Sequence, residues 1–317
     1  MDNSIKPINL SKITTYSIMD RKSKVDIKNF AKPWKSGQNF SYFLDNLPSI
    51  LGAQDLKSVI SAITKAAQQK KQIYFSMGAH VIKVGLNPII TELIRKKIIT
   101  MISMNGAGII HDLEIAMTGK TSEDVAASIG DGNFGMAEET STFLSQAIKN
   151  ASKKSKGLGR AVGEMINKEK LPFRNMSLFA TCASFNIPAT VHVAIGTDII
   201  HMHPLFDAGC CGKASHLDFR IFASQITKLE KGVYINAGSA VILPEIFLKA
   251  LTLARNLGFN LNNFTSVNLD FIRHYRPITN VVNRPTLKGG KGYNITGHHE
   301  ILIPLIAAGV IEKIEQD

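Results

Sequence analysis

The chain has 317 residues, 44% of them hydrophobic and 20% charged, which is the composition of a globular protein and excludes one dominated by disorder. Its apolar stretches are interrupted before they reach the about 18 residues of a membrane span, and residues 1–10 lack the apolar segment of a secretory signal, so we expect a cytoplasmic protein without a membrane segment. The net charge of +12 comes from scattered lysines without interleaved aromatic residues, which argues against a nucleic-acid partner.

The first 37 residues are predicted to form an extended arm, and residues 38–317 a single α/β domain. Arms of this kind often pack on a neighbouring subunit. Apolar spacing predicts helices from Asn39 to Leu47 and from Asp55 through Gln69. A buried strand, 72–77, follows.

Strand–loop–helix units then alternate along the chain. Strands are predicted at 98–104, 187–194, 232–236 and 264–269, and helices at 88–97, 175–185, 215–228 and 241–257. An amphipathic segment follows the Gly106-Ala107-Gly108 turn, Thr121–Asp124 is typical of a helix start, and the loop 131–140 leads into a long helix toward Asn150. A final glycine-rich loop precedes a last helix through Ala308. This alternation predicts one mostly parallel, doubly wound, Rossmann-like sheet with helices on both faces.

Polar and glycine residues follow five of the predicted strands, at the edge where such sheets bind ligands. The stretch Asn105–Glu114 is the most pronounced, because a Gly106-Ala107-Gly108 turn there opens a helix that also carries titratable groups. Other strand-end groups are His80 and Lys83, 197–203, 236–239 and 270–276.

Three kinds of chemistry are open to these residues. Glycines at strand-to-helix turns favour a dinucleotide site, although the spacing G-x-G-x-x-G is absent. A metal site is an alternative, in which His201 and His203 join His80, His111 or Asp198, although no HExxH motif occurs.

Covalent catalysis is the third. Lys83, Lys288 and Lys291 lie in glycine-flanked segments where a lysine can become a nucleophile. A thiolate at Cys210 or Cys211 near the loop histidines is a further alternative.

Several strings of the sequence resemble deoxyhypusine synthases, and more closely their bacterial deoxyhypusine synthase-like relatives. They are Gly78-Ala-His-Val-Ile-Lys-Val-Gly-Leu86, Met104-Asn-Gly-Ala-Gly108, Ser122-Glu-Asp-Val125, Ala194-Ile-Gly-Thr-Asp198, His201-Met-His-Pro204, Ile235-Asn-Ala-Gly-Ser239 and Gly297-His-His-Glu300. The resemblance covers most of the chain, from about Met19 onward.

The resemblance implies an NAD-dependent transferase that oxidises a polyamine such as spermidine to an imine and passes the aminobutyl group to a protein lysine or a small diamine. It also implies a homotetramer with active sites at subunit interfaces. The implied cofactor contacts are Gly78, Ala79, His80, Asn105, Gly106, Ala107, Gly108, Asp198, Gly238 and Ser239.

Histidines take the place of family carboxylates at His111 and His203, which we expect to act as acid–base groups. Lys83, Lys288 or Lys291 would form the covalent adduct. The predicted substrate-binding residues are His111, Asp112, Glu114, His201, His203, Asp270 and His274. No metal is expected in this interpretation.

Overall fold

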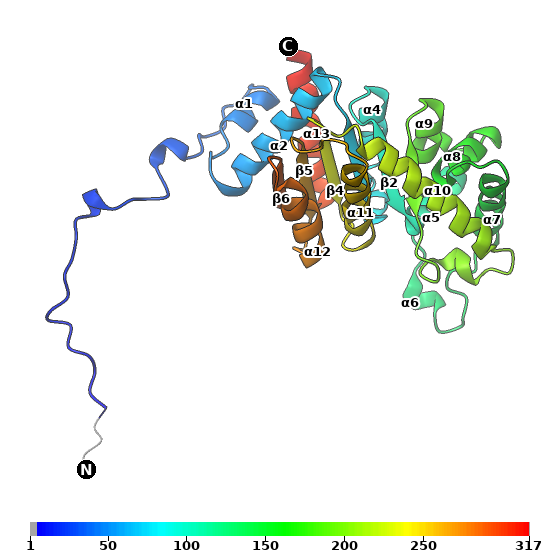
Figure 1. Ribbon diagram of the computed structural model, residues 1–317, viewed down its shortest axis with the longest axis horizontal. Helices are drawn as coiled ribbons and strands as arrows, with labels where there is room; N and C mark the ends of the chain where they lie inside the picture. Colours follow the sequence, from blue (N-terminus) through cyan, green and yellow to red (C-terminus); the bar gives the residue numbers. More distant parts are fainter. Residues whose placement is uncertain (1–4, 317) are drawn as a thin grey trace.

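A sheet of six parallel strands forms the centre of the computed structural model, which describes residues 5–316. The strand order is β3-β2-β1-β4-β5-β6, so the direction of chain progression reverses between β1 and β4 (Figure 1). The strands are β1 (Ile73–Met77), β2 (Met101–Asn105), β3 (Ala189–His192), β4 (Val233–Ala237), β5 (Thr265–Asp270) and β6 (Lys291–Thr296). This confirms the predicted Rossmann-like, doubly wound fold, whose reversal point is the usual place for a ligand.

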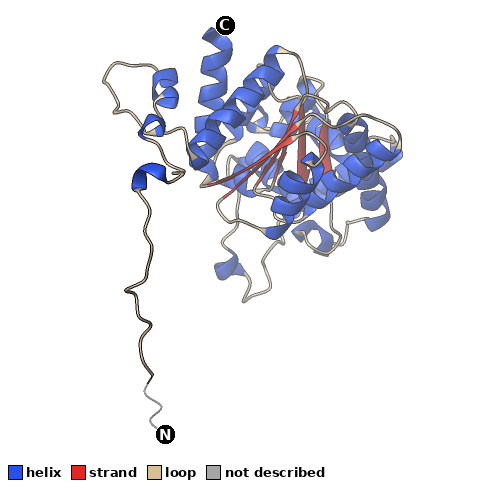
Figure 2. Cartoon of the chain, turned by 60° about the vertical axis from the view of Figure 1, so that its left-hand side comes forward, coloured by secondary structure: helices blue, strands red, loops and turns tan. Residues whose placement is uncertain are grey.

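Helices cover both faces of the sheet (Figure 2). One face packs against α2 (Leu51–Gln68), α4 (Asn87–Arg95), α5 (Gly106–Thr118) and α13 (His299–Gln316), and the other against α10 (Ala208–Ile226) and α11 (Ile242–Asn256). Alternate strand residues serve the two cores: Phe75 and Ile235 face the first, Tyr74 and Tyr234 the second. Strands buried on both faces explain why the apolar runs in the sequence are nearly continuous.

The remaining helices surround this core. They are α1 (Phe40–Asp45), α3 (His80–Lys83), α6 (Val125–Ser128), α7 (Glu138–Lys153), α8 (Leu158–Lys168), α9 (Leu178–Ser184) and α12 (Tyr275–Pro277). Short single turns are η1 (Ile18–Asp20), η2 (Ile27–Asn29), η3 (Arg174–Met176), η4 (Ile199–Met202), the π-helical η5 (Ile278–Asn283) and η6 (Arg284–Thr286).

A row of polar side chains crosses the sheet one or two residues before the strands end. Thr190 donates to Ser103 at 2.9 Å, Asn236 to Asn268 at 2.8 Å, and Asn268 to Asn294 at 2.8 Å. The row is in register across all strands and comprises Thr190, Ser103, Ser76, Asn236, Asn268 and Asn294. These bonds tie neighbouring strands together just beneath the carboxyl edge and hold that edge in a fixed geometry.

Helix α8 and strand β6 are among the elements that were not predicted. Helix α8 contains Gly159 and Gly163, which the sequence pattern treats as helix breakers. A Cβ on Gly159 would lie 2.3 Å from the Ala189 carbonyl oxygen, and one on Gly163 would lie 2.1 Å from that of Phe179. Both glycines therefore allow α8 to pack closely on its neighbours. Strand β6 escaped prediction because it is a mostly polar edge strand within a glycine-rich segment.

The described part of the arm, residues 5–36, leaves the body beside α1 and extends away from it (Figures 1 and 2). Its side chains are almost all exposed. Residues 1–4 of the predicted arm lie outside the described residues. Within residues 5–316, no helix is long and apolar enough to cross a membrane.

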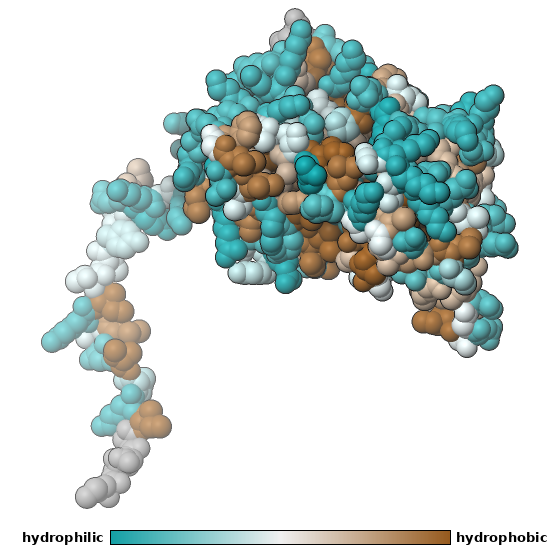
Figure 3. Space-filling view, turned by 45° about the vertical axis from the view of Figure 1, so that its right-hand side comes forward, coloured by the Kyte–Doolittle hydropathy of each residue, from teal (hydrophilic) through white to brown (hydrophobic). Residues whose placement is uncertain are grey.

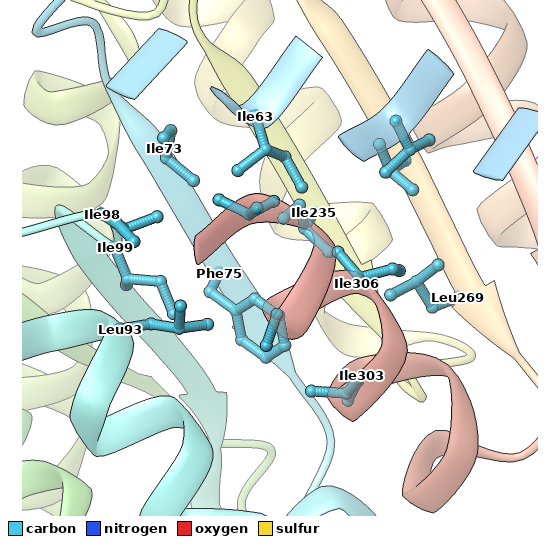
Figure 4. Close-up of a pocket in the computed structure, with 14 residues that line it drawn as sticks. Ile63, Ile73, Phe75, Leu93, Ile98, Ile99, Ile235, Leu269, Ile303 and Ile306 are labelled. Carbon is cyan, nitrogen blue, oxygen red and sulfur yellow. The ribbon is translucent and has the colours of Figure 1, made fainter. Parts of the chain in front are cut away.

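A small cavity of about 30 Å³ lies between the sheet and helix α13 (Figure 4). All fourteen residues that line it are apolar, among them Phe75, Ile235 and Ile306. A cavity of this size and polarity has no group that would hold a ligand, so we assign it to imperfect packing of the core.

Candidate active site

The carboxyl ends of β1 and β4 meet through two glycines at the reversal point. A Cβ on Gly78 would lie 2.4 Å from the carbonyl oxygen of Gly238, and Gly238 itself has a φ of +67°. Because a side chain at either position would collide or be strained, the two loops approach as closely as backbones can. Ala79 follows Gly78 at the start of α3, and the Ser239 hydroxyl accepts a hydrogen bond from the Leu243 amide at 3.2 Å.

The first turn of α5 begins directly at the end of β2, without an intervening loop. A Cβ on Gly106 would lie 1.9 Å from Oδ2 of Asp198, so the carboxylate of Asp198 covers this glycine. Gly108 lies against the side chain of Met104, because a Cβ at this position would lie 2.6 Å from Cε of Met104. These contacts show that the glycines first serve packing, and that the predicted backbone cradle for phosphate is partly filled by Asp198.

Three polar atoms beside this turn are buried and have no hydrogen-bond partner: Oδ1 of Asn105, Oδ2 of Asp198 and Nε2 of His201. Oδ2 of Asp198 and Nε2 of His201 lie 3.9 Å apart, too far for a direct hydrogen bond. Burial raises the pKa of Asp198 to about 6 and lowers the pKa of His201.

The tautomer of His201 follows from its other nitrogen. Nδ1 accepts hydrogen bonds from the backbone amides of Gly196 at 3.0 Å and Asp198 at 3.1 Å, so the proton of the neutral ring is on Nε2. His201 therefore carries an unpartnered donor 3.9 Å from an unpartnered acceptor on Asp198. A hydroxyl group bound between them would accept from the first and donate to the second.

A hydrogen-bonded chain links His111 to Glu114 through Thr121. The Thr121 hydroxyl donates to Oε2 of Glu114 at 2.6 Å and lies 2.7 Å from Nδ1 of His111. Because its single proton goes to the carboxylate, the hydroxyl accepts from Nδ1–H, which leaves Nε2 of His111 as a free base. Burial, and to a smaller extent the charge of Lys83, lower the pKa of His111 to about 4. The imidazole is therefore neutral at pH 7.

The neighbouring Asp112 does not belong to this site, which corrects its assignment as a substrate ligand. It is fully buried and points toward α9, where it accepts hydrogen bonds from the backbone amides of Leu178 at 2.8 Å and Phe179 at 3.3 Å. The Ser177 hydroxyl and the Asn87 amide also donate to it. Asp112 thus anchors the start of α9.

Aromatic rings gather at the ends of β1, β5 and β6. The ring of His80 lies 5.6 Å from that of Phe271 and 6.0 Å from that of His299, and Phe271 stacks on His298 at 6.2 Å. His299 is completely buried, and neither ring nitrogen has a partner. Burial lowers its pKa, while the charge of Asp270 acts in the opposite direction.

The remaining histidines of the predicted site lie at the margin. His203 follows η4, and its Nδ1 accepts from the Leu205 amide at 3.3 Å. His274 precedes α12. Neither has a contact to the His111 chain.

The three predicted lysines are separated by the sheet. Lys83 ends α3, at the carboxyl edge, close enough to His111 for its charge to act on the ring. Lys291 is the first residue of β6, opposite the first residue of β5, so it lies at the amino edge. Lys288 precedes it. Because all strands are parallel, Lys288 and Lys291 lie at the opposite edge of the sheet from the other site residues of the same chain.

The histidines of the metal alternative are dispersed as well. His80 contacts Phe271 and His299, His111 contacts Thr121, and His201 packs on Phe206. Within residues 5–316, no three His, Cys, Asp or Glu side chains are arranged to hold a metal ion. The thiol alternative also weakens, because burial raises the pKa of Cys211 to about 11.

Sequence reasoning missed three contributors to this edge. Thr121 was noted only as a helix start, Phe271 was not singled out, and the pair His298-His299 appeared only within the string Gly297-His-His-Glu300, without a role in the site. A hydroxyl ten residues after His111 gives no sequence signal, because the loop that returns it has no regular period. The pair His298-His299 directly after a strand end was detectable, once β6 was recognised as a strand.

No family model and no curated protein matches the chain. Solved structures resemble its fold. A protein from Entamoeba histolytica, provisionally assigned as a deoxyhypusine synthase, has a TM-score of 0.51 and 15% identity over 89% of this chain and 96% of that chain. A provisionally assigned, conserved LOR/SDH protein from Methanococcus maripaludis S2 has a TM-score of 0.51 and 14% identity over 89% of this chain and 72% of that chain.

AgrE, solved in a ternary complex with ornithine and NAD⁺, has a TM-score of 0.53 and 14% identity over 86% of this chain. The match covers 35% of the AgrE chain, so this chain spans about a third of that protein. At these identities the likeness establishes a shared Rossmann-like fold with proteins of the deoxyhypusine synthase and LOR/SDH type.

Proposed function

We propose that this protein is an NAD-dependent enzyme that oxidises an amine substrate, a polyamine such as spermidine, and transfers its aminobutyl group to an amine acceptor. The observation that carries the proposal is the unpartnered pair formed by Oδ2 of Asp198 and Nε2 of His201. A hydroxyl bound between them would satisfy both atoms, and the ribose groups of a dinucleotide carry hydroxyls; Rossmann-like folds bind dinucleotides at the reversal point of the strand order.

The residues around the reversal point fit a dinucleotide in other respects. Gly78 and Gly238 keep the ends of β1 and β4 free of side chains. Asn105 offers an unpartnered acceptor next to Asp198. We propose Gly78, Ala79, His80, Asn105, Asp198, Gly238 and Ser239 as cofactor contacts, with Gly106, Ala107 and Gly108 contributing through the first turn of α5.

Bound NAD would supply the acceptor for a hydride from the carbon beside the substrate nitrogen, and the source of that hydride at the end of the cycle. Nε2 of His111 takes the proton from that nitrogen, and the chain through Thr121 to Glu114 stabilises the imidazolium that results. The product of this half-reaction is an imine of the substrate.

We propose Lys83 as the covalent residue, because it is close enough to His111 for its charge to act on the ring. Its side-chain nitrogen would add to the imine carbon, and the original carbon–nitrogen bond would break as the leaving amine takes the proton from His111. An acceptor amine then displaces Lys83 by the same exchange. We propose His203, Asp270 and His274 as further contacts of the polyamine.

Amine-dependent NADH formation, followed by fluorescence, tests this proposal. We expect a signal with a polyamine and a borohydride-stable adduct that maps to Lys83. Lys83→Arg should retain NAD binding and lose the adduct. An adduct on Lys288 or Lys291 would reject Lys83 as the nucleophile, and NAD binding without any amine-dependent signal would reject the transferase.

We further propose that the protein self-associates through its arm, as a homotetramer with sites at subunit interfaces. Ile5, Met19 and Ile27 are 99%, 87% and 79% exposed, and apolar side chains recur along the arm (Figure 3). Exposed apolar surface of this extent favours a protein partner. In sedimentation velocity, Ile18→Asp with Ile27→Asp should lower the assembly state. Unchanged sedimentation would argue against the arm as an interface.

A further inference from the structure

A wide groove lies at the amino edge of the sheet, opposite the candidate active site. It has a volume of about 810 Å³ and is bounded by α2, the starts of β4, β5 and β6, and the end of α13. Its volume falls within the range of small-molecule sites. Nothing in the proposed function uses it.

The charges that line the groove are all positive. Five lysines, and no aspartate or glutamate, contribute to its walls: Lys57, Lys65, Lys231, Lys291 and Lys313. They come from four separate parts of the chain, so the fold and not a local run of basic sequence brings them together. Neighbouring carboxylates include Glu230, beside Lys231, Glu312, beside Lys313 in the chain, and Asp45, in an adjoining hollow that shares Lys65 and Lys313.

Three of these lysines lack counter-charges. In the part of the chain that the structure describes, Lys65, Lys291 and Lys313 form no ion pair or side-chain hydrogen bond, whereas Lys57 donates to the backbone oxygen of Leu47 at 2.7 Å. Unpaired cations that face one another repel, and an anion between them removes this repulsion.

Neutral hydrogen-bonding groups complete the walls. Ser58, Ser61 and Gln54 project from α2, and Thr265 and Tyr293 from the strands. Phosphate oxygens accept from lysines and hydroxyls alike. The arm cannot fill the groove as a counter-charge, because residues 5–36 carry eight Lys or Arg and two Asp.

We infer that this groove binds a small molecule with several phosphate groups. Single-stranded nucleic acid fits less well, because Tyr293 and the buried Phe264 are the only aromatic residues among those that line it, and such ligands need exposed rings for stacking. The site is independent of the proposed catalytic function, since it lies at the opposite edge.

Calorimetric titration of the full-length protein with tripolyphosphate at low ionic strength tests the inference. We expect binding that weakens with added salt, and that weakens at least about tenfold in the variant Lys65→Gln, Lys291→Gln, Lys313→Gln. The matched control Lys24→Gln, Lys153→Gln, Lys154→Gln removes the same charge from exposed positions elsewhere and should bind as the unmodified protein does.

Thermal melting shows whether the triple variant is folded, and the single variant Lys291→Gln provides a milder test of the same loss. No binding at millimolar tripolyphosphate would overturn the inference. Equal weakening of tripolyphosphate binding in both triple variants would show that the binding depends on net charge and not on the groove, which would overturn the inference. Tighter binding of a single-stranded oligonucleotide that competes with tripolyphosphate would replace it with a nucleic-acid site.

Discussion

At the carboxyl edge of the sheet, side chains lack hydrogen-bond partners, whereas at the amino edge they lack counter-charges. Asp198 and His201 at the first edge are a buried acceptor and a buried donor. Lys65 and Lys291 at the second are exposed cations. Buried polar groups select ligands by geometry, and exposed cations select them by charge. The two edges of one sheet are thus suited to different ligands.

We expect the largest effect, a loss of stability, from a substitution at the carboxyl edge where β1 and β4 approach each other. Gly78→Ala places a methyl group against the carbonyl oxygen of Gly238, and the backbone can yield only if β1 and β4 separate. Urea denaturation should show a loss of about 2–4 kcal/mol in the free energy of unfolding.

Gly212→Ala is the matched control for this substitution. Gly212 lies inside α10, and nothing lies within 4 Å of the position that its Cβ would take. This change should stabilise the protein by up to about 1 kcal/mol. Equal stability of the two variants would contradict the close approach of the loops.

The next effect concerns the proton chain. Thr121→Val removes the hydroxyl that joins His111 to Glu114 while keeping the size of the side chain. We expect kcat for the amine-dependent reaction to fall about a hundredfold, because the imidazolium loses its stabilising partner. Thr121→Ser should restore most of the rate. A full rate in Thr121→Val would exclude the chain from catalysis.

The third expected effect, a change in NAD affinity with pH, is smaller than the effect on kcat. The pKa of Asp198 is raised to about 6, and its ionised form accepts the ligand hydroxyl. The carboxylate is therefore available above pH 6 and is lost as the pH falls through this value. NAD should bind about tenfold more weakly at pH 5 than at pH 7. Asp198→Asn should bind weakly at both pH values, and an unchanged dependence in this variant would assign the titration to another group.

The smallest effect lies between the edges, in the apolar cavity shown in Figure 4. Val267→Ile adds one methyl group to its lining and should stabilise the protein by at most about 1 kcal/mol in urea denaturation. Ligand binding at both edges should stay unchanged. A change in NAD affinity would show that the core beneath the carboxyl edge is coupled to the site.

The sheet was predictable because its strands can be recognised in the sequence as apolar runs between glycines. The strands that carry Phe75 and Ile235 show no regular alternation of apolar and polar residues, since both faces of the sheet are covered by helices. Helix α8 was missed because Gly159 and Gly163 appear as breakers until the packing of their neighbours is known.

The site was predictable in part, for a similar reason. Parallel strands guarantee that Gly78, Asn105 and Gly238 share one edge, so the cofactor contacts could be grouped from sequence. Sequence order does not reveal which way a side chain leaves a helix. Asp112 and His111 are adjacent, yet one anchors α9 and the other faces the site. Lys291 was named as a covalent candidate in a glycine-flanked segment, and its place at the amino edge could not be known before β6 was recognised as a strand.

Titration of NAD into the full-length protein at pH 7, followed by calorimetry, tests the central claim most directly. We predict saturable binding of one NAD per chain that is strongly weakened by Asp198→Ala and unaffected by the variant Lys65→Gln, Lys291→Gln, Lys313→Gln. Absence of binding at millimolar NAD, or loss of binding in the lysine variant with Asp198→Ala unaffected, would contradict the assignment of the cofactor to the carboxyl edge.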